Sequence, residues 1–152
     1  MVNYVKDKAS ADAVVLAIEK EGGKARAVRA GISKENEVLE LFRFIDNEFG
    51  RLDALVNNAG ILETQMRVEQ MTEARLQRIF QANVIAPFIC SREAIKRMAA
   101  RNSGPGGVIV NVSSGASRGG SPNEYVDYAA SKGAIDTFTI GLAKELAKRT
   151  SG

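Results

Sequence analysis

Two residues that can exchange protons lie four positions apart near the end of the chain, Tyr128 and Lys132. On a helix this spacing places both side chains on one face, and an ammonium beside a phenol favours the ionised phenolate. The pair can therefore act as an acid and base toward an alcohol or carbonyl oxygen. Surface pairs of this kind are also common on amphipathic helices, so the spacing alone leaves both interpretations open.

Asn83 is a second candidate, because this amide shares an apolar stripe with Leu76, Ile79 and Phe80. An unpaired buried amide is costly, so its side chain requires partners. Pro87 follows four residues later and has no N–H, so the carbonyl of Asn83 also loses its helical partner and the helix should bend there. These needs fit either a functional role or a kinked helix filled by a structural water.

Small polar residues follow two predicted strands. The sequence NNAG, with Asn57, Ala59 and Gly60, follows a strand at residues 52–56, and Ser113 and Ser114 follow a strand at residues 108–112. Ligands of open α/β sheets bind at the carboxyl ends of the strands. Either serine hydroxyl could donate a hydrogen bond to a substrate oxygen there.

The glycine-rich segment at residues 115–120 resembles a phosphate-binding loop. Such a loop runs directly into a helix, whereas here Ser121, Pro122 and Asn123 intervene and the segment follows a late strand. The pattern therefore favours a mobile loop on the substrate side over a phosphate cradle.

The elements that must position these residues alternate between strand and helix patterns, which predicts an α/β domain with a mostly parallel sheet spanning residues 1–152. The helix that ends near Gly22 should turn Val14, Val15 and Ile18 inward, and the next helix should start at an N-cap Ser33. The full prediction comprises strands at 2–5, 25–30, 52–56 and 108–112, with the last two buried, an amphipathic helix over 33–50, a helix from Thr72 that buries Leu76, Ile79, Phe80 and Val84, loops at 101–107 and 113–122, and a last helix at about 125–148.

Composition excludes several classes of function. The chain has 152 residues, 45% of them hydrophobic, with no His and one Cys, so Cys/His zinc clusters, Ser-His-Asp and Cys-His catalytic groups and an internal disulfide are impossible. The net charge of +3 is spread along the chain, which argues against nucleic-acid binding. No apolar run approaches the about 18 residues of a membrane helix, and no signal peptide is visible, so we expect a cytoplasmic protein without a metal site.

Taken together, NNAG at 57–60, Asn83, NVSS ending at Ser114 and YAASK from Tyr128 to Lys132 resemble the short-chain dehydrogenase/reductase family. Two sequence segments, LDALVNNAGI and YVDYAASKGAID, most resemble the bacterial 3-oxoacyl-acyl-carrier-protein reductase and glucose dehydrogenase-like branch of this family. The resemblance implies a Rossmann-like, doubly wound parallel sheet and transfer of hydride between a nicotinamide and a ketone or alcohol.

By this resemblance, Tyr128 is the general acid/base and Ser114 holds the substrate oxygen. Lys132 binds the nicotinamide ribose and assists Tyr128, while the carbonyl of Asn83 holds a water that connects Lys132 to solvent. Asn57, Ala59 and Gly60 lie beside the cofactor.

The resemblance also assigns Gly31 and Ile32 to the adenine side of the cofactor, where the family usually has Asp at the position of Gly31. Loss of that carboxylate implies weaker cofactor binding. Replacing Gly31 with Asp should strengthen it again. Asn3-Tyr4 stands where relatives that prefer NAD place an acidic residue, so we expect NADP, with NAD possible.

Compared with the family, the chain looks like an internal fragment. The first strand, its glycine-rich loop and the last strands are missing, which would leave a gap in the strand order 3-2-1-4-5-6. In its full-length form the protein is expected to act on a small-molecule carbonyl or alcohol and to form a dimer or tetramer. The alternative is a non-catalytic remnant that folds or associates through its long helices.

Overall fold

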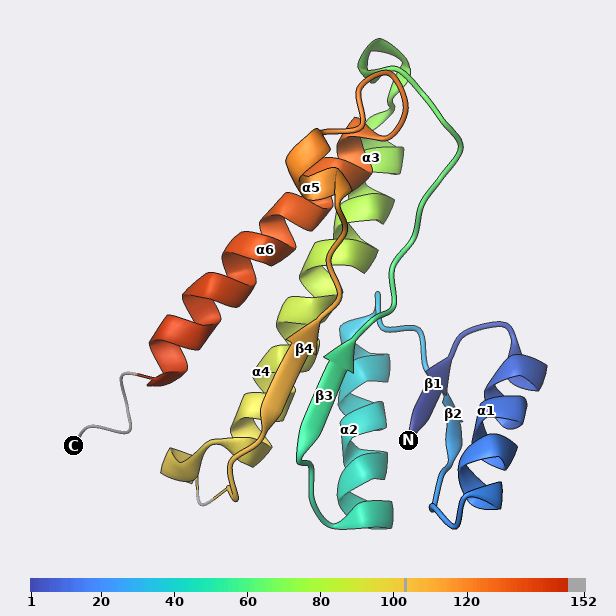
Figure 1. The fold of residues 1–152 in the computed structure, drawn as a ribbon, viewed down its shortest axis with the longest axis vertical. Helices are drawn as coiled ribbons and strands as arrows, with labels where there is room; N and C mark the ends of the chain where they lie inside the picture. The colour runs from blue at the N-terminus through green and yellow to red at the C-terminus, as the bar shows by residue number, and fades with distance from the viewer. Residues whose placement is uncertain (103, 148–152) are drawn as a thin grey trace. The chain divides into compact units, whose positions relative to one another are not determined.

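The computed structural model describes residues 1–102 and 104–147, and its strands and helices alternate along the chain as the sequence predicts (Figure 1). This order confirms the α/β class. The predicted end of the last helix, Lys148, lies outside the described residues. The elements are β1 (Val2–Tyr4), α1 (Lys8–Lys20), β2 (Ala27–Arg29), α2 (Glu35–Phe49), β3 (Ala54–Asn57), the 3₁₀ turn η1 (Val68–Gln70), α3 (Glu73–Phe80), the π-helical turn η2 (Gln81–Ile85), α4 (Ala86–Met98), the 3₁₀ turn η3 (Ala100–Asn102), β4 (Val108–Asn111), α5 (Ala116–Gly119) and α6 (Val126–Ala147).

Within the described residues the strands form two separate two-stranded sheets, one of β1 with β2 and one of β3 with β4. Both pairs are parallel, as predicted. The chain also divides into two compact units, one of residues 1–53 with 93–107 and one of residues 54–92 with 108 onward. A single domain over residues 1–152 stays a prediction.

In the first unit, α2 buries the predicted stripe of Val38, Leu41, Phe42 and Ile45 and ends at Gly50, which adopts a left-handed conformation with φ 69°. The prediction of Ser33 as the N-cap is wrong, because the helix begins after Lys34. Residues 31–34 form a turn instead, in which the N–H of Lys34 donates to the carbonyl of Gly31.

The predicted inward face of α1 is also wrong, because Val14 and Ile18 are exposed and Val15 is half-buried. This helix packs against β1 and β2 and buries only Ala11. One contact with a narrow two-stranded sheet covers only a small part of a helix surface.

In the second unit, side chains on one face of the β3–β4 sheet bond to the helices. Asn57 donates to Ser91 on α4 at 3.1 Å and to Asn111 on β4 at 2.8 Å, and Asn111 donates to Thr139 on α6 at 2.9 Å. The prediction that both strands are buried is wrong for the other face. Successive side chains of a strand point to opposite sides, and Val56, Val108 and Val110 are exposed.

The helical run from α3 to α4 changes its hydrogen bonding where the sequence predicts an irregularity. Residues Gln81–Ile85 form a π-helical turn, in which the N–H of Ala86 donates to the carbonyl of Gln81. Ile79 is buried and Phe80 and Val84 are half-buried, but Leu76 is exposed, contrary to prediction, and Arg75 is buried in its place.

The predicted loop at residues 113–122 contains the one-turn helix α5. In the part of the chain that the structure describes, no helix has the length and apolar character needed to cross a membrane.

Candidate functional site

Tyr128 lies in the first turn of α6, and Lys132 lies one turn later on the same face. The ammonium nitrogen of Lys132 is 5.7 Å from the centroid of the Tyr128 ring. Tyr128 is half-buried, whereas Lys132 is only 6% exposed. A buried lysine next to a phenol differs from the solvated surface pair that the spacing alone also allowed.

The buried ammonium of Lys132 is held at the end of β4. Its Nζ donates to the carbonyl oxygen of Val112, directly after the strand, at 2.8 Å. Gly60 approaches from the loop after β3, where a Cβ would lie 3.7 Å from Nζ of Lys132 and 3.2 Å from Oδ1 of Asn83. The second distance is tighter than ordinary contact, so the glycine keeps this loop close to both residues.

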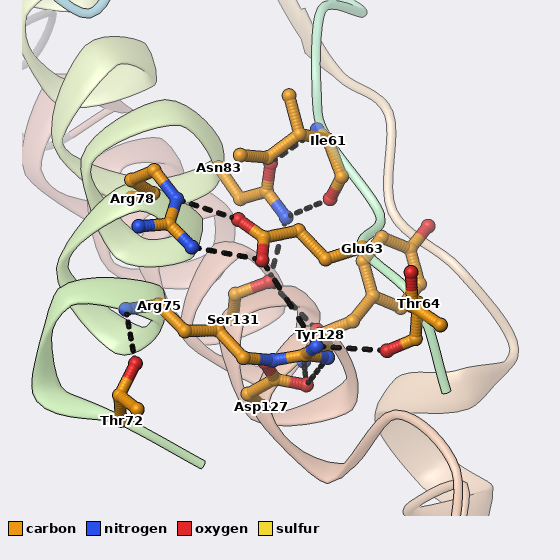
Figure 2. Close-up of polar contacts among 10 residues, drawn as sticks. All are labelled: Ile61, Glu63, Thr64, Thr72, Arg75, Arg78, Asn83, Asp127, Tyr128 and Ser131. Carbon is orange, nitrogen blue, oxygen red and sulfur yellow. Dashed lines mark hydrogen bonds and ion pairs between the residues drawn. The ribbon is translucent and has the colours of Figure 1, made fainter. Parts of the chain in front are cut away.

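Asn83, in the π-helical turn, has a fully paired side chain. Its Oδ1 accepts from the N–H of Ile61 at 2.7 Å, and its Nδ2 donates to the carbonyl of Ile61 at 2.9 Å and to Oγ of Ser131 at 3.1 Å (Figure 2). Ser131 in turn donates to the carbonyl of Tyr128 at 2.7 Å. The amide therefore connects the loop after β3 to the helix that carries Tyr128 and Lys132.

The two serines after β4 make different contacts. Oγ of Ser114 accepts from the N–H of Ala116 at 3.2 Å, and Oγ of Ser113 lies 3.5 Å from the carbonyl of Lys132. Asp136, one turn beyond Lys132, has its pKa lowered by hydrogen bonds from Ser113 and Ser117. A carboxylate on α6 thus holds the loop that carries Ser114.

Two predicted cofactor residues, Gly31 and Ile32, belong to the first unit. The N–H of Gly31 donates to Oε2 of Glu37 at 2.6 Å, so a carboxylate already stands beside the position where the family usually has Asp. Lys34 and the Gly31 N–H lower the pKa of Glu37. In the same unit, the amide of Asn3 donates to the carbonyls of Val28 and Ala30.

The remaining predicted residues lie in the second unit. Asn57 joins the polar contacts on the inner face of the β3–β4 sheet, whereas Ala59 and Gly60 are exposed in the loop that follows. This unit thus brings together Gly60, Asn83, Tyr128 and Lys132, while Ser114 lies in the segment after β4.

Sequence reasoning missed a buried ion pair next to Tyr128. Nε of Arg75 donates to Oδ2 of Asp127 at 2.7 Å, and the two residues are 3% and 4% exposed (Figure 2). Burial alone would raise the pKa of Asp127, but hydrogen bonds from Arg75 and the N–H of Tyr128 outweigh it and lower that pKa. The same pairing raises the pKa of Arg75. The sequence signal that could have indicated this pair is the charged residue Arg75 next to the apolar stripe of Leu76 and Ile79.

Within residues 1–102 and 104–147, no group of three or more His, Cys, Asp or Glu residues could hold a metal ion.

Comparisons with known proteins agree along the whole chain. A sequence model of the short chain dehydrogenase family matches residues 1–150. An uncharacterised oxidoreductase of Escherichia coli, YgfF, is 56% identical over 146 residues, which cover 96% of this chain and 59% of that protein. A 3-oxoacyl-[acyl-carrier-protein] reductase of Synechocystis is 36% identical over 98% of this chain and 58% of its own length.

A solved structure supports the predicted α/β fold. A short chain dehydrogenase from Burkholderia cenocepacia in complex with NADP superimposes with a TM-score of 0.83 at 34% identity, over 97% of this chain and 58% of that one. The chain therefore spans slightly less than three fifths of the length of each of these proteins.

Proposed function

Because the chain belongs to the short chain dehydrogenase family, we propose that it serves in NADP-dependent oxidoreduction of a small-molecule ketone or alcohol, with NAD as the possible alternative cofactor. The observation that carries the proposal is the pairing of Tyr128 with a buried Lys132 whose ammonium is 5.7 Å from the phenol ring. The NADP bound by the Burkholderia relative supports the choice of cofactor.

The residues around Lys132 fit a nucleotide. An ammonium has three N–H donors, and the bond to Val112 uses one, which leaves donors for ribose hydroxyls. A Cβ at position 60 would crowd Oδ1 of Asn83 at 3.2 Å and would occupy the space in contact with Nζ of Lys132, so glycine there leaves that space beside the ammonium free. The other residues that we propose to lie beside the cofactor are Asn57, Ala59, Gly60, Gly31 and Ile32. NADPH titration of variants at these positions measures the contribution of each to cofactor binding.

When bound, the nicotinamide supplies or accepts the hydride. The phenol of Tyr128 donates its proton to the carbonyl oxygen during reduction and takes the alcohol proton during oxidation. The hydroxyl of Ser114 holds the same substrate oxygen. Lys132 lies beside the phenol ring and would hold the nicotinamide ribose, and the backbone carbonyl of Asn83 holds the water through which Lys132 exchanges protons with solvent.

A hybrid protein tests this assignment. The 146 residues of this chain that match the E. coli relative would replace the corresponding region of that protein, and ketone reduction by NADPH would be followed by nicotinamide absorbance. Tyr128→Phe is expected to lower turnover at least 10³-fold, on the order of general acid–base catalysis, and to leave NADPH affinity within about threefold. Tyr125→Phe is the matched control and should retain activity. Turnover that survives Tyr128→Phe would exclude the assignment.

The alternative function, a non-catalytic remnant that associates through its surfaces, rests on the apolar residues that the second unit exposes. Val56, Val108 and Val110 cover one face of the sheet, and Phe88 on α4 and Ile140 on α6 are 48% and 57% exposed. In this family the long helices often build the interface of a dimer or tetramer, so we propose a homo-oligomer for the full-length form. A cytoplasmic location is a separate proposal. Titration of the 152-residue chain with NADPH and NADH, with sedimentation of the same samples, separates the two functions. Self-association without saturable cofactor binding would favour the remnant.

A further inference from the structure

The buried ion pair of Arg75 and Asp127 touches the proposed catalytic residue directly. Oδ1 of Asp127 accepts from the backbone N–H of Tyr128 at 2.9 Å, while Oδ2 accepts from Nε of Arg75 at 2.7 Å. Nη2 of Arg75 completes a two-pronged contact to Oδ1 at 3.4 Å. The carboxylate thus joins the start of α6 to the guanidinium of a residue 52 positions earlier in the chain.

Arg75 is itself held from two other segments. Its Nη1 donates to the carbonyl of Thr64 at 2.7 Å, and its backbone N–H donates to the hydroxyl of Thr72, the N-cap of α3, at 3.3 Å. A second carboxylate, Glu63, lies 4.0 Å from Nη1. Arg75 lies in the first turn of α3, and its guanidinium therefore fixes the loop after β3 and the start of α6 relative to that helix (Figure 2).

The loop after β3 is attached at two points. At one end Asn83 binds both backbone polar groups of Ile61, and at the other Arg75 binds Thr64. The backbone of Tyr128 is bonded on both sides, by Asp127 at its N–H and by Ser131 at its carbonyl. The fork of an arginine fixes direction as well as distance, which a single point charge does not.

We infer that Arg75 and Asp127 are positioning residues that set the place of Tyr128 relative to the loop after β3. This inference rests on the proposed role of Tyr128 and deepens it, because neither residue of the pair exchanges a proton or contacts the reacting atoms. A misplacement of about 1 Å at a catalytic group can cost roughly 100-fold in rate. Removal of the pair should therefore lower turnover while cofactor and substrate still bind.

The main variant of the test avoids a buried unpaired charge. The double variant Arg75→Gln/Asp127→Asn replaces the ion pair with neutral amides and keeps an oxygen that can accept from the N–H of Tyr128. Asp127→Asn alone isolates the loss of the carboxylate. Arg78→Gln is the matched control, because Arg78 lies one turn further along α3 and pairs with Glu63 at 2.8 Å on the surface.

The first measurement does not depend on activity. The 152-residue chain would be labelled with 3-fluorotyrosine, and the fluorine resonance of Tyr128 identified by its loss in Tyr128→Phe. We expect the double variant to shift or broaden the Tyr128 resonance and to leave that of Tyr4 unchanged, while Arg78→Gln moves neither. An unchanged Tyr128 resonance in the folded double variant would refute the inference.

The second measurement uses the hybrid with the E. coli relative. The double variant should lower kcat about 10- to 100-fold, with KM and the Kd for NADPH within threefold of the parent. A parental kcat in the double variant overturns the inference even if the resonance moves. A hybrid that is inactive with all residues intact counts against the proposed function alone, and the fluorine spectrum then decides the inference by itself.

Discussion

Asn83→Ala should strongly destabilise the second unit, because the amide side chain is 1% exposed and pairs with both backbone polar groups of Ile61. Truncation removes three hydrogen bonds, two to the backbone of Ile61 and one to Oγ of Ser131, each with a net contribution of about 0.5–1.5 kcal/mol. The sum is about 1.5–4.5 kcal/mol, with the lower end expected if water reaches the backbone of Ile61, which is 37% exposed.

The assay is urea denaturation followed by circular dichroism, with exchange of the Ile61 amide hydrogen measured by NMR. Asn102→Ala is the matched control, since its exposed amide also donates to a backbone carbonyl, that of Lys96 at 3.2 Å. The control should change the free energy of unfolding by less than about 0.5 kcal/mol. A loss below about 1 kcal/mol for Asn83→Ala, or unchanged protection of Ile61, would show that the amide does not hold the loop.

Three further predictions concern single positions. Gly31→Asp should lower the free energy of unfolding by about 0.5–1 kcal/mol, because the new Cβ would lie 3.1 Å from Oε2 of Glu37 and the new carboxylate would add a like charge. NADPH titration should show tighter binding only when Glu37→Gln is added to Gly31→Asp. Tighter NADPH binding by Gly31→Asp alone would contradict this prediction. The lowered pKa of Asp127 contributes stability that is present above its ordinary value near 3.9 and is lost as pH falls toward the folded value. The urea midpoints of the parent chain and of Asp127→Asn should therefore converge as the pH falls below about 4. A difference between the two midpoints that stays constant from about pH 7 to 3 would show that ionisation of Asp127 does not contribute to stability. Pro87→Ala restores an N–H that can bond the carbonyl of Asn83, so thermal unfolding should occur at higher temperature while hybrid turnover falls; unchanged turnover would remove that carbonyl from the mechanism.

Local sequence patterns predicted the order of elements because the strand and helix periods differ and glycine marks several boundaries. Gly50 ends α2 in the left-handed conformation that the pattern implies, and Pro87 marks the helical irregularity that became the turn Gln81–Ile85. Such signals lie within a few residues of the feature they predict. Motif spacing likewise predicted the shared face of Tyr128 and Lys132.

Two of the failures share a different cause, which is dependence on a partner far along the chain. The apolar pattern favoured Leu76 as a buried residue, but the structure buries Arg75 because Asp127 offers a carboxylate 52 residues later. Val56 and Val110 have the composition of a buried parallel strand, yet burial depends on whether a second layer covers their face. No local period carries that information.

Asn83 shows how the structure narrows a question that the sequence left open. The side chain needed partners, and Ile61 and Ser131 provide them, so the amide neither requires a structural water nor remains available to a ligand. The functional interpretation therefore moves from the side chain to the backbone carbonyl, which Pro87 deprives of its usual donor. A side-chain substitution at position 83 tests the loop, whereas a substitution at position 87 tests the proton path. If both reduced turnover, only the first should also remove the protection of Ile61, and that difference separates architecture from chemistry at this residue.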